Sequence, residues 1–470
     1  MGDKEKSQAE LLKEKLLMNP ENSGIAMSEE QIKTADAFCE DYKKFLDTAK
    51  TEREAVTATV EILEKAGYKP FDIKAKYSAG DKIYLNNRGK AVAFAVIGTR
   101  PVTDGFKIIA SHIDSPRLDL KQRPLYEDSQ LALFKTHYYG GIRKYQWAAI
   151  PLALHGVVVK KDGNVVNVNI GEDDSDPVFC VNDLLPHLAK DQNKRPLNEG
   201  IRGEELNVLV GAMPFRDDKA SEKVKLNVMN ILHEKYGIVE KDFLSAELSI
   251  VPAFKARDIG FDHSMIGAYG HDDRVCAYTS LIASLENAAP EYTWVNIFAD
   301  KEETGSDGNT GLSSRFLEYF VSDIAAAFGE EGRTVLAASE CLSADVNAAF
   351  DPTFPDVAER RNTAYLNYGV CVTKYTGSGG KYSTNDASAE FTGKIARLLD
   401  ENDVIWQTGE LGKVDHGGGG TVAKYISKLG ADVIDIGVPV LSMHAPMEVV
   451  SKMDIYNTYL AFNAFLGSKN

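Results

Sequence analysis

The chain has 470 residues, of which 44% are hydrophobic and 26% are charged, which is enough apolar sequence for two or three domains with full cores. Its formal net charge is −16, with 69 acidic against 53 basic residues. This balance argues against nucleic-acid binding, which requires a basic surface. The five cysteines are an odd number without a C-x-x-C pair, which is typical of reduced thiols in a reducing compartment.

The amino-terminal segment, residues 1–17, is charged and has a helical pattern. It lacks the apolar centre of a secretory signal. Elsewhere no apolar run approaches the roughly 18 residues that a membrane helix needs. We therefore expect a soluble, cytoplasmic protein without a membrane partner.

Residues 28–67 predict one long helix or two. Apolar side chains such as Ala35, Phe38 and Tyr42 recur at helical spacing, and Gly67 marks the end of the pattern. Two short apolar runs, 92–97 and 106–113, are bounded by turn residues and predict buried strands.

Residues 116–255 differ in character from the rest of the chain. They contain short alternating segments, such as 165–170, separated by turn signals such as Asp162-Gly163-Asn164. We interpret 116–255 as an inserted β-rich domain whose strands supply a subunit interface. The insert interrupts a discontinuous domain made of residues 1–115 and 256–470.

From Gly270 onward, predicted strands and helices alternate. The predicted helices are 275–286, 314–328, 387–399 and 448–466, and the predicted strands are 294–299, 334–338 and 433–436. Alternation of this kind predicts an α/β fold, a three-layer sandwich with a mostly parallel central sheet.

Five short polar segments carry the candidate chemistry. Most of them end or follow a predicted strand, where ligands gather in open α/β sheets. They are 111–116, 270–274, 298–305, 343–346 and 442–445.

His112 and Asp114 belong to the first segment and point to the same side of a strand. A metal-binding imidazole usually gives its other N–H to a carboxylate, and Asp114 is in place to be that partner. The same pair is also typical of a strand-end histidine followed by a turn.

Two pairs of adjacent acids follow in the next segments. Asp272 and Asp273 precede a helix, where acids cap helices, but a carboxylate there is also able to bridge two metal ions. Glu302 and Glu303 come directly after a buried strand, where charge is costly unless it is paired or coordinated. One glutamate can bind metal while the other acts as a general base; the alternative is a solvated acidic loop.

Asp345 and His444 follow predicted strands and, taken singly, would usually be structural. The whole set, two histidines, three carboxylate ligands and a spare glutamate, matches a two-zinc hydrolase. The two histidines favour zinc over calcium or magnesium. No H-E-x-x-H motif is present, which excludes a metalloprotease site with one zinc ion bound by two histidines of a single helix.

At these residues the sequence resembles the aspartyl aminopeptidase family of zinc metallopeptidases, over nearly the whole chain including the insert. The resemblance implies His112 and Asp345 as terminal ligands of one zinc ion, Glu303 and His444 as ligands of the other, and Asp272 as the bridge. It also implies Glu302 as general base, Asp114 as support for His112, and a cis peptide bond after Asp272.

Three weaker matches concern substrate binding. His155 resembles a histidine that completes a neighbouring subunit's active site in the family, and Lys381 lies in a segment that resembles a substrate-contacting loop. Gly418 lies in a glycine run that resembles a loop beside the family's specificity pocket. Each has a plain alternative: a core histidine, an exposed lysine and a flexible turn. The glycine run differs from that of typical aspartyl-preferring members, which leaves the preferred substrate residue open.

The resemblance implies a metallo-aminopeptidase that hydrolyses an acidic or neutral N-terminal residue from peptides with a free N-terminus. The expected cofactor is two Zn²⁺ per subunit, replaceable by Co²⁺ or Mn²⁺. The expected assembly is a homo-oligomer, with dimers built into a tetrahedral dodecamer. Two alternatives stay open: another two-zinc amide hydrolase, such as a carboxypeptidase or deacylase, and a non-catalytic assembly protein on the same fold.

Overall fold

A computed structural model describes residues 6–469 of the chain, so residues 1–5 of the predicted N-terminal helical segment lie outside the described residues. The central feature is a nine-stranded mixed sheet with the order β1-β2-β3-β14-β4-β15-β19-β17-β18. Its strands are β1 (Lys69–Pro70), β2 (Lys82–Asn87), β3 (Ala91–Val96), β4 (Lys107–His112), β14 (Trp294–Ala299), β15 (Glu340–Ala344), β17 (Val370–Thr373), β18 (Trp406–Thr408) and β19 (Asp432–Gly437).

The middle of this sheet is parallel. Strands β14, β4, β15 and β19 run in the same direction, whereas β3 and β17 pair antiparallel on either side of them. The carboxyl ends of the four central strands therefore meet at one edge.

Both faces of the sheet are covered by helices. Along β3, Val92, Phe94 and Val96 join one hydrophobic cluster. Ala93 and Ala95 join a second, as the two-residue period of a strand requires. The first cluster includes α3 (Glu29–Thr48), α4 (Glu52–Lys65), α6 (His271–Glu286), α9 (Ala389–Glu401) and α11 (Lys452–Gly467). The second includes α7 (Phe316–Ala327), α8 (Gly332–Ala337) and α10 (Ala423–Ile426).

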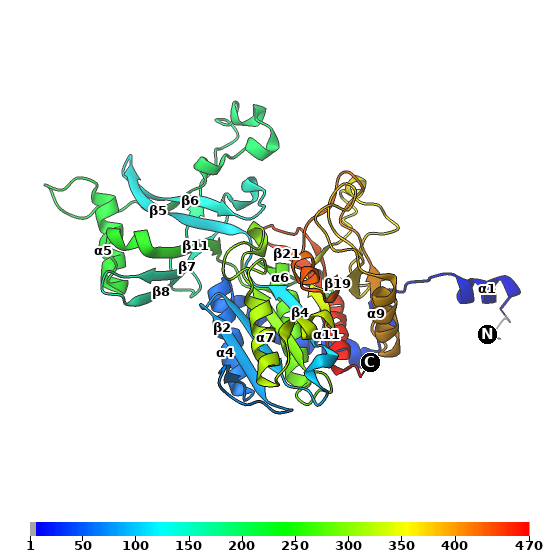
Figure 1. Ribbon diagram of the computed structural model, residues 1–470. Coiled ribbons are helices and arrows are strands. Elements are labelled where there is room, and N and C mark those ends of the chain that lie inside the picture. The colour runs from blue at the N-terminus through cyan, green and yellow to red at the C-terminus, as the bar shows by residue number, and fades with distance from the viewer. Residues whose placement is uncertain (1–5, 470) are drawn as a thin grey trace.

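A seven-stranded antiparallel sheet forms the separate lobe that lies to one side of the molecule in Figure 1. The strand order is β8-β7-β11-β5-β6-β10-β9. The lobe has a hydrophobic cluster of its own, to which helix α5 (Lys223–Tyr236) contributes. The strands are β5 (Arg117–Asp128), β6 (Leu131–Tyr139), β7 (Leu152–Val159), β8 (Val165–Ile170), β9 (Cys180–Val181), β10 (Asn207–Gly211) and β11 (Ala246–Pro252). All of these strands lie inside 116–255, although the domain boundaries themselves stay a prediction.

A third sheet of five strands, which we call the support sheet, has the order β12-β13-β21-β20-β16. Its strands are β12 (Arg257–Ile259), β13 (Met265–Ala268), β16 (Asn347–Ala348), β20 (Pro439–Leu441) and β21 (Glu448–Ser451). Strand β13 leads into α6, and β20 leads into the loop before β21.

Two sequence-based predictions of elements are wrong. Residues 334–338 are not a strand: α8 covers Gly332–Ala337, and the strand is β15. A short apolar run does not distinguish a buried helix from a buried strand. The last helix begins at Lys452 rather than 448, because Val449 and Val450 pair with β13 in the support sheet.

The predicted helical region 28–67 forms two helices. Thr51 caps α4, its hydroxyl accepting the N–H of Glu54 in a capping box. The remaining strand predictions at 92–97, 106–113, 294–299 and 433–436 are confirmed to within about two residues at each end by β3, β4, β14 and β19.

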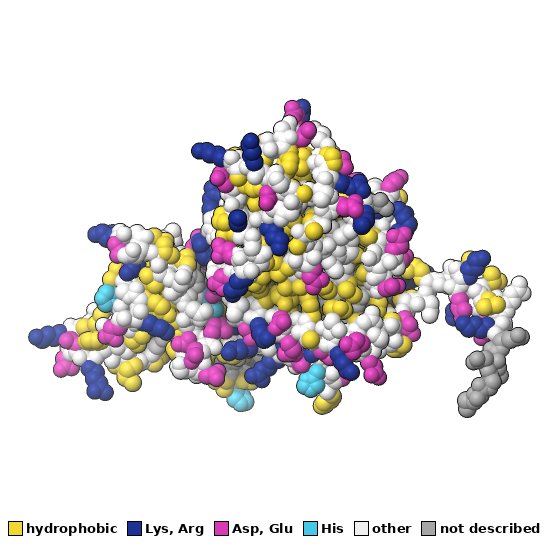
Figure 2. Space-filling view, turned by 90° about the horizontal axis from the view of Figure 1, so that it is seen from below, with side chains coloured by type: hydrophobic (Ala, Val, Ile, Leu, Met, Phe, Trp, Pro, Cys, Tyr) yellow, Lys and Arg dark blue, Asp and Glu magenta, His cyan; other side chains and the backbone are white. Residues whose placement is uncertain are grey.

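Helix α1 (Gln8–Leu16) lies apart from the body of the molecule in both views (Figures 1 and 2) and buries none of its residues. Over the face in Figure 2, charged side chains of both signs are mixed with apolar ones. Among residues 6–469, none of the helices combines the length and apolar composition needed to cross a membrane.

Candidate metal centre

The parallel strands bring three of the predicted segments to the same edge. β4 ends at His112, directly opposite Ala299 at the end of β14, and Glu302 and Glu303 follow β14. β15 pairs with β4 on its other side, and Asp345 follows it. Asp272 opens α6, and His444 lies in the loop after β20.

His112 faces three of the predicted carboxylates. Its Nε2 lies 3.1 Å from Asp272 Oδ1, 3.7 Å from Asp345 Oδ1 and 3.9 Å from Glu302 Oε2. The histidine is buried, with only 1% of its side chain exposed. One imidazole nitrogen thus points into a group of oxygen atoms from three separate elements.

His444 faces the other side of the same aspartate. Its Nε2 lies 3.2 Å from Asp272 Oδ2 and 3.5 Å from Glu303 Oε2. Asp272 therefore lies between the two histidines and turns one carboxylate oxygen toward each. This is the arrangement of a carboxylate that bridges two metal ions.

The second nitrogen of each imidazole is bonded away from the cluster. His112 Nδ1 lies 3.0 Å from the backbone oxygen of Asp114, and His444 Nδ1 lies 2.8 Å from the backbone oxygen of Gly141. Since a carbonyl oxygen only accepts, each Nδ1 carries the proton. Each Nε2 is then the nitrogen that can offer a lone pair to a metal ion once it has lost its proton.

Asp114 organises the two glutamates. Its Oδ1 accepts the N–H of Glu302 at 3.1 Å and its Oδ2 accepts the N–H of Glu303 at 3.2 Å. The hydroxyl of Tyr139, at the end of β6, donates to the same Oδ2 at 2.8 Å. Asp114 thus fixes the turn that carries both glutamates as well as the ring of His112.

Gly270 makes room for the loop that carries Asp272. A Cβ at this position would lie 1.9 Å from the Nη1 of Arg274, and its φ of +78° favours glycine. Further along this loop, the peptide bond between Asp272 and Asp273 is cis. This confirms the expectation from the family resemblance.

The donor set fits zinc. Within residues 6–469, the buried Oδ1 of Asp273 and Oε1 of Glu303 have no hydrogen-bond partner, which is costly unless a cation lies nearby. Two groups of three residues could each hold an ion, because within each group the ligand atoms all lie within 4.8 Å of one another. The groups are His112, Asp273 and Asp345, and His112, Asp272 and Glu303. Imidazole and carboxylate are ligands that zinc accepts.

Burial and mutual repulsion raise the pKa values of several acids in the cluster. Burial, followed by the charges of neighbouring carboxylates, raises the pKa of Glu302 to about 8, partly offset by His112. Burial also raises the pKa of Glu303 and of Asp345. For His444, burial lowers the pKa, but the hydrogen bond to Asp272 and the charge of Glu303 raise it to about 11. A bound cation would relieve the repulsion between these acids.

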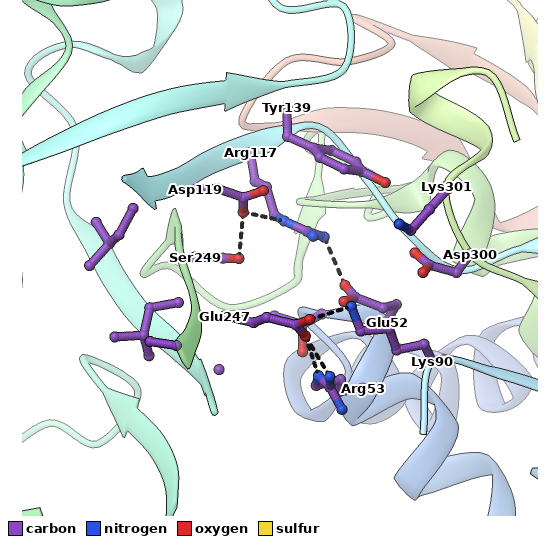
Figure 3. A pocket seen from close by; sticks show the side chains of 15 residues that line it. Glu52, Arg53, Lys90, Arg117, Asp119, Tyr139, Glu247, Ser249, Asp300 and Lys301 are labelled. Atoms are coloured by element: carbon purple, nitrogen blue, oxygen red, sulfur yellow. Dashed lines mark hydrogen bonds and ion pairs between the residues drawn. The ribbon is translucent and has the colours of Figure 1, made fainter. Parts of the chain in front are cut away.

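A polar cavity of about 240 Å³ lies between the insert and α4, beside this centre (Figure 3). Arg117 donates to Glu52 and to Asp119, both at 2.8 Å, and its guanidinium lies 4.2 Å from the centre of the Tyr139 ring. Because Tyr139 also binds Asp114, this charged network connects the insert to the metal centre.

The three predicted substrate contacts lie outside the cluster. His155 is 1% exposed, and its ring nitrogens lie 2.7 Å from Glu54 and 3.0 Å from Glu172 of the same chain. Lys381 and Gly418 line a second cavity, of about 50 Å³, where Lys381 pairs with Asp386 at 2.9 Å. The structure therefore brings together the seven residues predicted for metal binding and catalysis, but not these three.

Four residues that contact the centre have no role in the sequence-based assignment: Asp273, Tyr139, Gly141 and Glu448. Asp273 follows the predicted ligand Asp272 directly, and this position is a sequence signal that could have identified it. The other three lie on the insert or beyond the last motif, and no local pattern indicates them.

The fold and the cluster first define the class of protein. Two histidines with several carboxylates at the carboxyl edge of a sheet are typical of the ligand set of a zinc-dependent hydrolase. In agreement, a family model described as aminopeptidase I zinc metalloprotease (M18) matches residues 45–466.

Individual relatives agree along almost the full length. A probable M18 family aminopeptidase 1 of Clostridium acetobutylicum is 52% identical, over 96% of this chain and 99% of its own. The crystal structure of aminopeptidase I from Clostridium acetobutylicum has a TM-score of 0.91 at 50% identity, covering 96% of this chain and 100% of that one. The M18 aminopeptidase structure from Thermotoga maritima has a TM-score of 0.92 at 45% identity, covering 96% and 99%.

The chain therefore belongs to the M18 family of zinc-dependent aminopeptidases. It is a metallo-aminopeptidase, a hydrolase of peptide bonds. The dodecamer of mApe1 from S. cerevisiae is similar in fold, with a TM-score of 0.75 at 21% identity over 92% of this chain and 97% of that one.

Proposed function

We propose that this aminopeptidase releases the N-terminal residue of peptides at two zinc ions. His112 and Asp345 would hold one ion, Glu303 and His444 the other, and Asp272 would bridge them. The observation that carries the proposal is the position of Asp272, whose two oxygens face the two histidines at 3.1 and 3.2 Å. Co²⁺ or Mn²⁺ would be able to replace zinc, since both accept nitrogen and oxygen ligands.

Zinc at this position supplies Lewis-acid chemistry, polarising a carbonyl and lowering the pKa of water. The chain supplies the proton transfers. The carboxylate of Glu302 points toward the cluster, with Oε2 3.9 Å from His112 Nε2. We propose that it accepts a proton from the attacking water and passes it to the leaving amine. Asp114 keeps Glu302 in place through the backbone N–H.

The variant Glu302→Gln tests this assignment. It keeps the shape of the side chain but removes the base, so turnover should fall by about 10²–10⁴-fold while zinc stays bound. The measurement is hydrolysis of an aminoacyl reporter together with metal content. Wild-type rates in the variant would refute the role of Glu302.

The substrate is a peptide with a free N-terminus. The preferred first residue is acidic or neutral, and we propose that Lys381 and Gly418, which line one cavity, contribute to its pocket. A panel of aminoacyl substrates assayed with zinc, cobalt and manganese would identify the residue. Acetylated peptides serve as the control, because a carboxypeptidase or a deacylase would not require the free amine.

We propose a three-layer catalytic domain, residues 1–115 and 256–470, and a dimerisation domain, 116–255. In support, the insert exposes an apolar groove of about 440 Å³ between its sheet and α5, lined among others by Val178 and Ile231. Dimers would assemble into a tetrahedral dodecamer, as a relative of the same fold forms a dodecamer. The role of His155 in a neighbouring subunit's site stays a prediction, which requires its ring to leave Glu54 and Glu172.

A further inference from the structure

A buried carboxylate lies directly behind the metal centre and binds the backbone of two proposed ligands. Glu448, the first residue of β21, is 1% exposed. Its Oε2 accepts the N–H of Asp272 at 3.0 Å, and its Oε1 accepts the N–H of His444 at 2.7 Å. A single side chain thus joins two ligands that are far apart in sequence.

The support sheet brings these groups together. β21 pairs antiparallel with β13, with Glu448 opposite Ala268. β13 continues into the loop that carries Asp272, while β20 continues into the loop that carries His444. Both loops therefore leave the sheet beside Glu448, and its two oxygens face their backbone N–H groups.

The geometry fixes the distance between the two ligands. Both oxygens of a carboxyl group can accept hydrogen bonds at once. With both backbones held this way, His444 Nε2 lies 3.2 Å from Asp272 Oδ2, where the two atoms can share one ion.

We propose that Glu448 is a positioning residue, which sets the affinity of the enzyme for the zinc ion shared by Asp272 and His444. The inference rests on the proposed two-zinc function. Glu448 would not touch the substrate or the reacting water, so its effect would pass entirely through the two ligands.

The variant Glu448→Gln tests the proposal. The amide keeps one accepting oxygen but turns an NH₂ group toward the other backbone N–H. Zinc affinity at one of the two ions should fall by about 10- to 100-fold, the range for groups that support metal ligands. At saturating zinc, kcat should return toward the wild-type value with little change in KM. A competitive chelator titration and metal counting by mass spectrometry give the affinities.

Asp454 offers a matched control. It is also a fully buried carboxylate whose two oxygens accept backbone N–H groups, those of Asn367 at 2.8 Å and Gly369 at 2.7 Å. Its partners are not proposed ligands. Asp454→Asn should lower the melting temperature and leave zinc affinity unchanged.

Wild-type zinc affinity in Glu448→Gln, or an equal loss in Asp454→Asn, would overturn the proposal. If Glu448→Gln does not fold, Glu448→Asp replaces it. The carboxyl group remains, but the side chain is one methylene too short to reach both N–H groups, so zinc should again bind more weakly. Wild-type affinity in that variant would equally overturn the proposal. A wild-type enzyme without zinc-dependent hydrolysis would refute the two-zinc function instead, which separates the two failures.

Discussion

Asp114 shows how much of this centre depends on hydrogen bonds at single residues. The carboxylate accepts three hydrogen bonds, from the N–H groups of Glu302 and Glu303 and from the hydroxyl of Tyr139. It also lies 3.3 Å from the ring of His112. Removing one of these donors should therefore disturb the proposed general base and a proposed metal ligand together.

The variant Tyr139→Phe removes the hydroxyl but keeps the ring against Arg117. A hydrogen bond to a charged group contributes about 1.5–3 kcal/mol, so kcat should fall between about 10- and 150-fold, with zinc still bound. Steady-state kinetics at saturating zinc provide the measurement. Tyr138→Phe, at the neighbouring and 42% exposed position, is the control. Equal rates for both variants would show that the hydroxyl does not position Asp114.

At the scale of elements, the insert is joined to the rest of the chain by a buried charge cluster. His155 of β7 lies between Glu54 of α4 and Glu172, which also accepts from Lys50 at 2.6 Å. Burial lowers the pKa of His155, but the hydrogen bonds to the two glutamates raise it above its ordinary value overall. The charged imidazole therefore stabilises the contact between the insert and α4.

This contact predicts a dependence of stability on pH. A histidine whose folded-state pKa is raised contributes stability that is complete below its unfolded pKa, about 6.5, and is lost as pH rises through the folded-state value. His155→Gln should therefore cost most at pH 6, about 3 kcal/mol for a broken buried pair, and less at pH 9.

The measurement is the melting temperature of wild type and variant between pH 6 and pH 9. His187→Gln, at an exposed position, should show no such difference. A cost for His155→Gln that is constant over this range would contradict the assignment of a charged imidazole.

At the scale of the whole molecule, the proposed assembly depends on the apolar groove of the insert. Val178 and Ile231 are each 53% exposed in the single chain, and apolar groups of this size in a groove mark interaction surfaces. Wild-type protein should scatter light as a particle with about twelve times the mass of one chain if it forms the same dodecamer.

Ile231→Asp introduces a charge into this groove and should release smaller particles, because an unpaired buried charge costs several kcal/mol at each copy of the interface. Glu234→Lys changes a charge on the same helix at an exposed position and should leave the particle mass unchanged. A monomeric wild-type protein would rule out the assembly and the inter-subunit role of His155.

The candidate ligands could be predicted from the sequence because each is a rare residue type at a recognisable local place. His112, Glu302 and Glu303 end or follow apolar runs that form β4 and β14. Asp345 was also found, although the strand before it is β15 rather than residues 334–338. A short apolar run is too short for its periodicity to distinguish a helix from a strand. The position of the strand before Asp345 was therefore predicted wrongly, although the residue itself was identified.

The sequence alone thus determined the chemistry of the site, since residue types and their positions at strand ends are local properties. Only the tertiary structure decided which atoms meet. The pairing of β13 with β21 puts Glu448 behind two proposed ligands, and the chain at the end of β6 brings Tyr139 to Asp114 and Gly141 to His444. Such contacts join segments that are far apart in the chain, and no local pattern records them because they arise from the order and register in which strands pair.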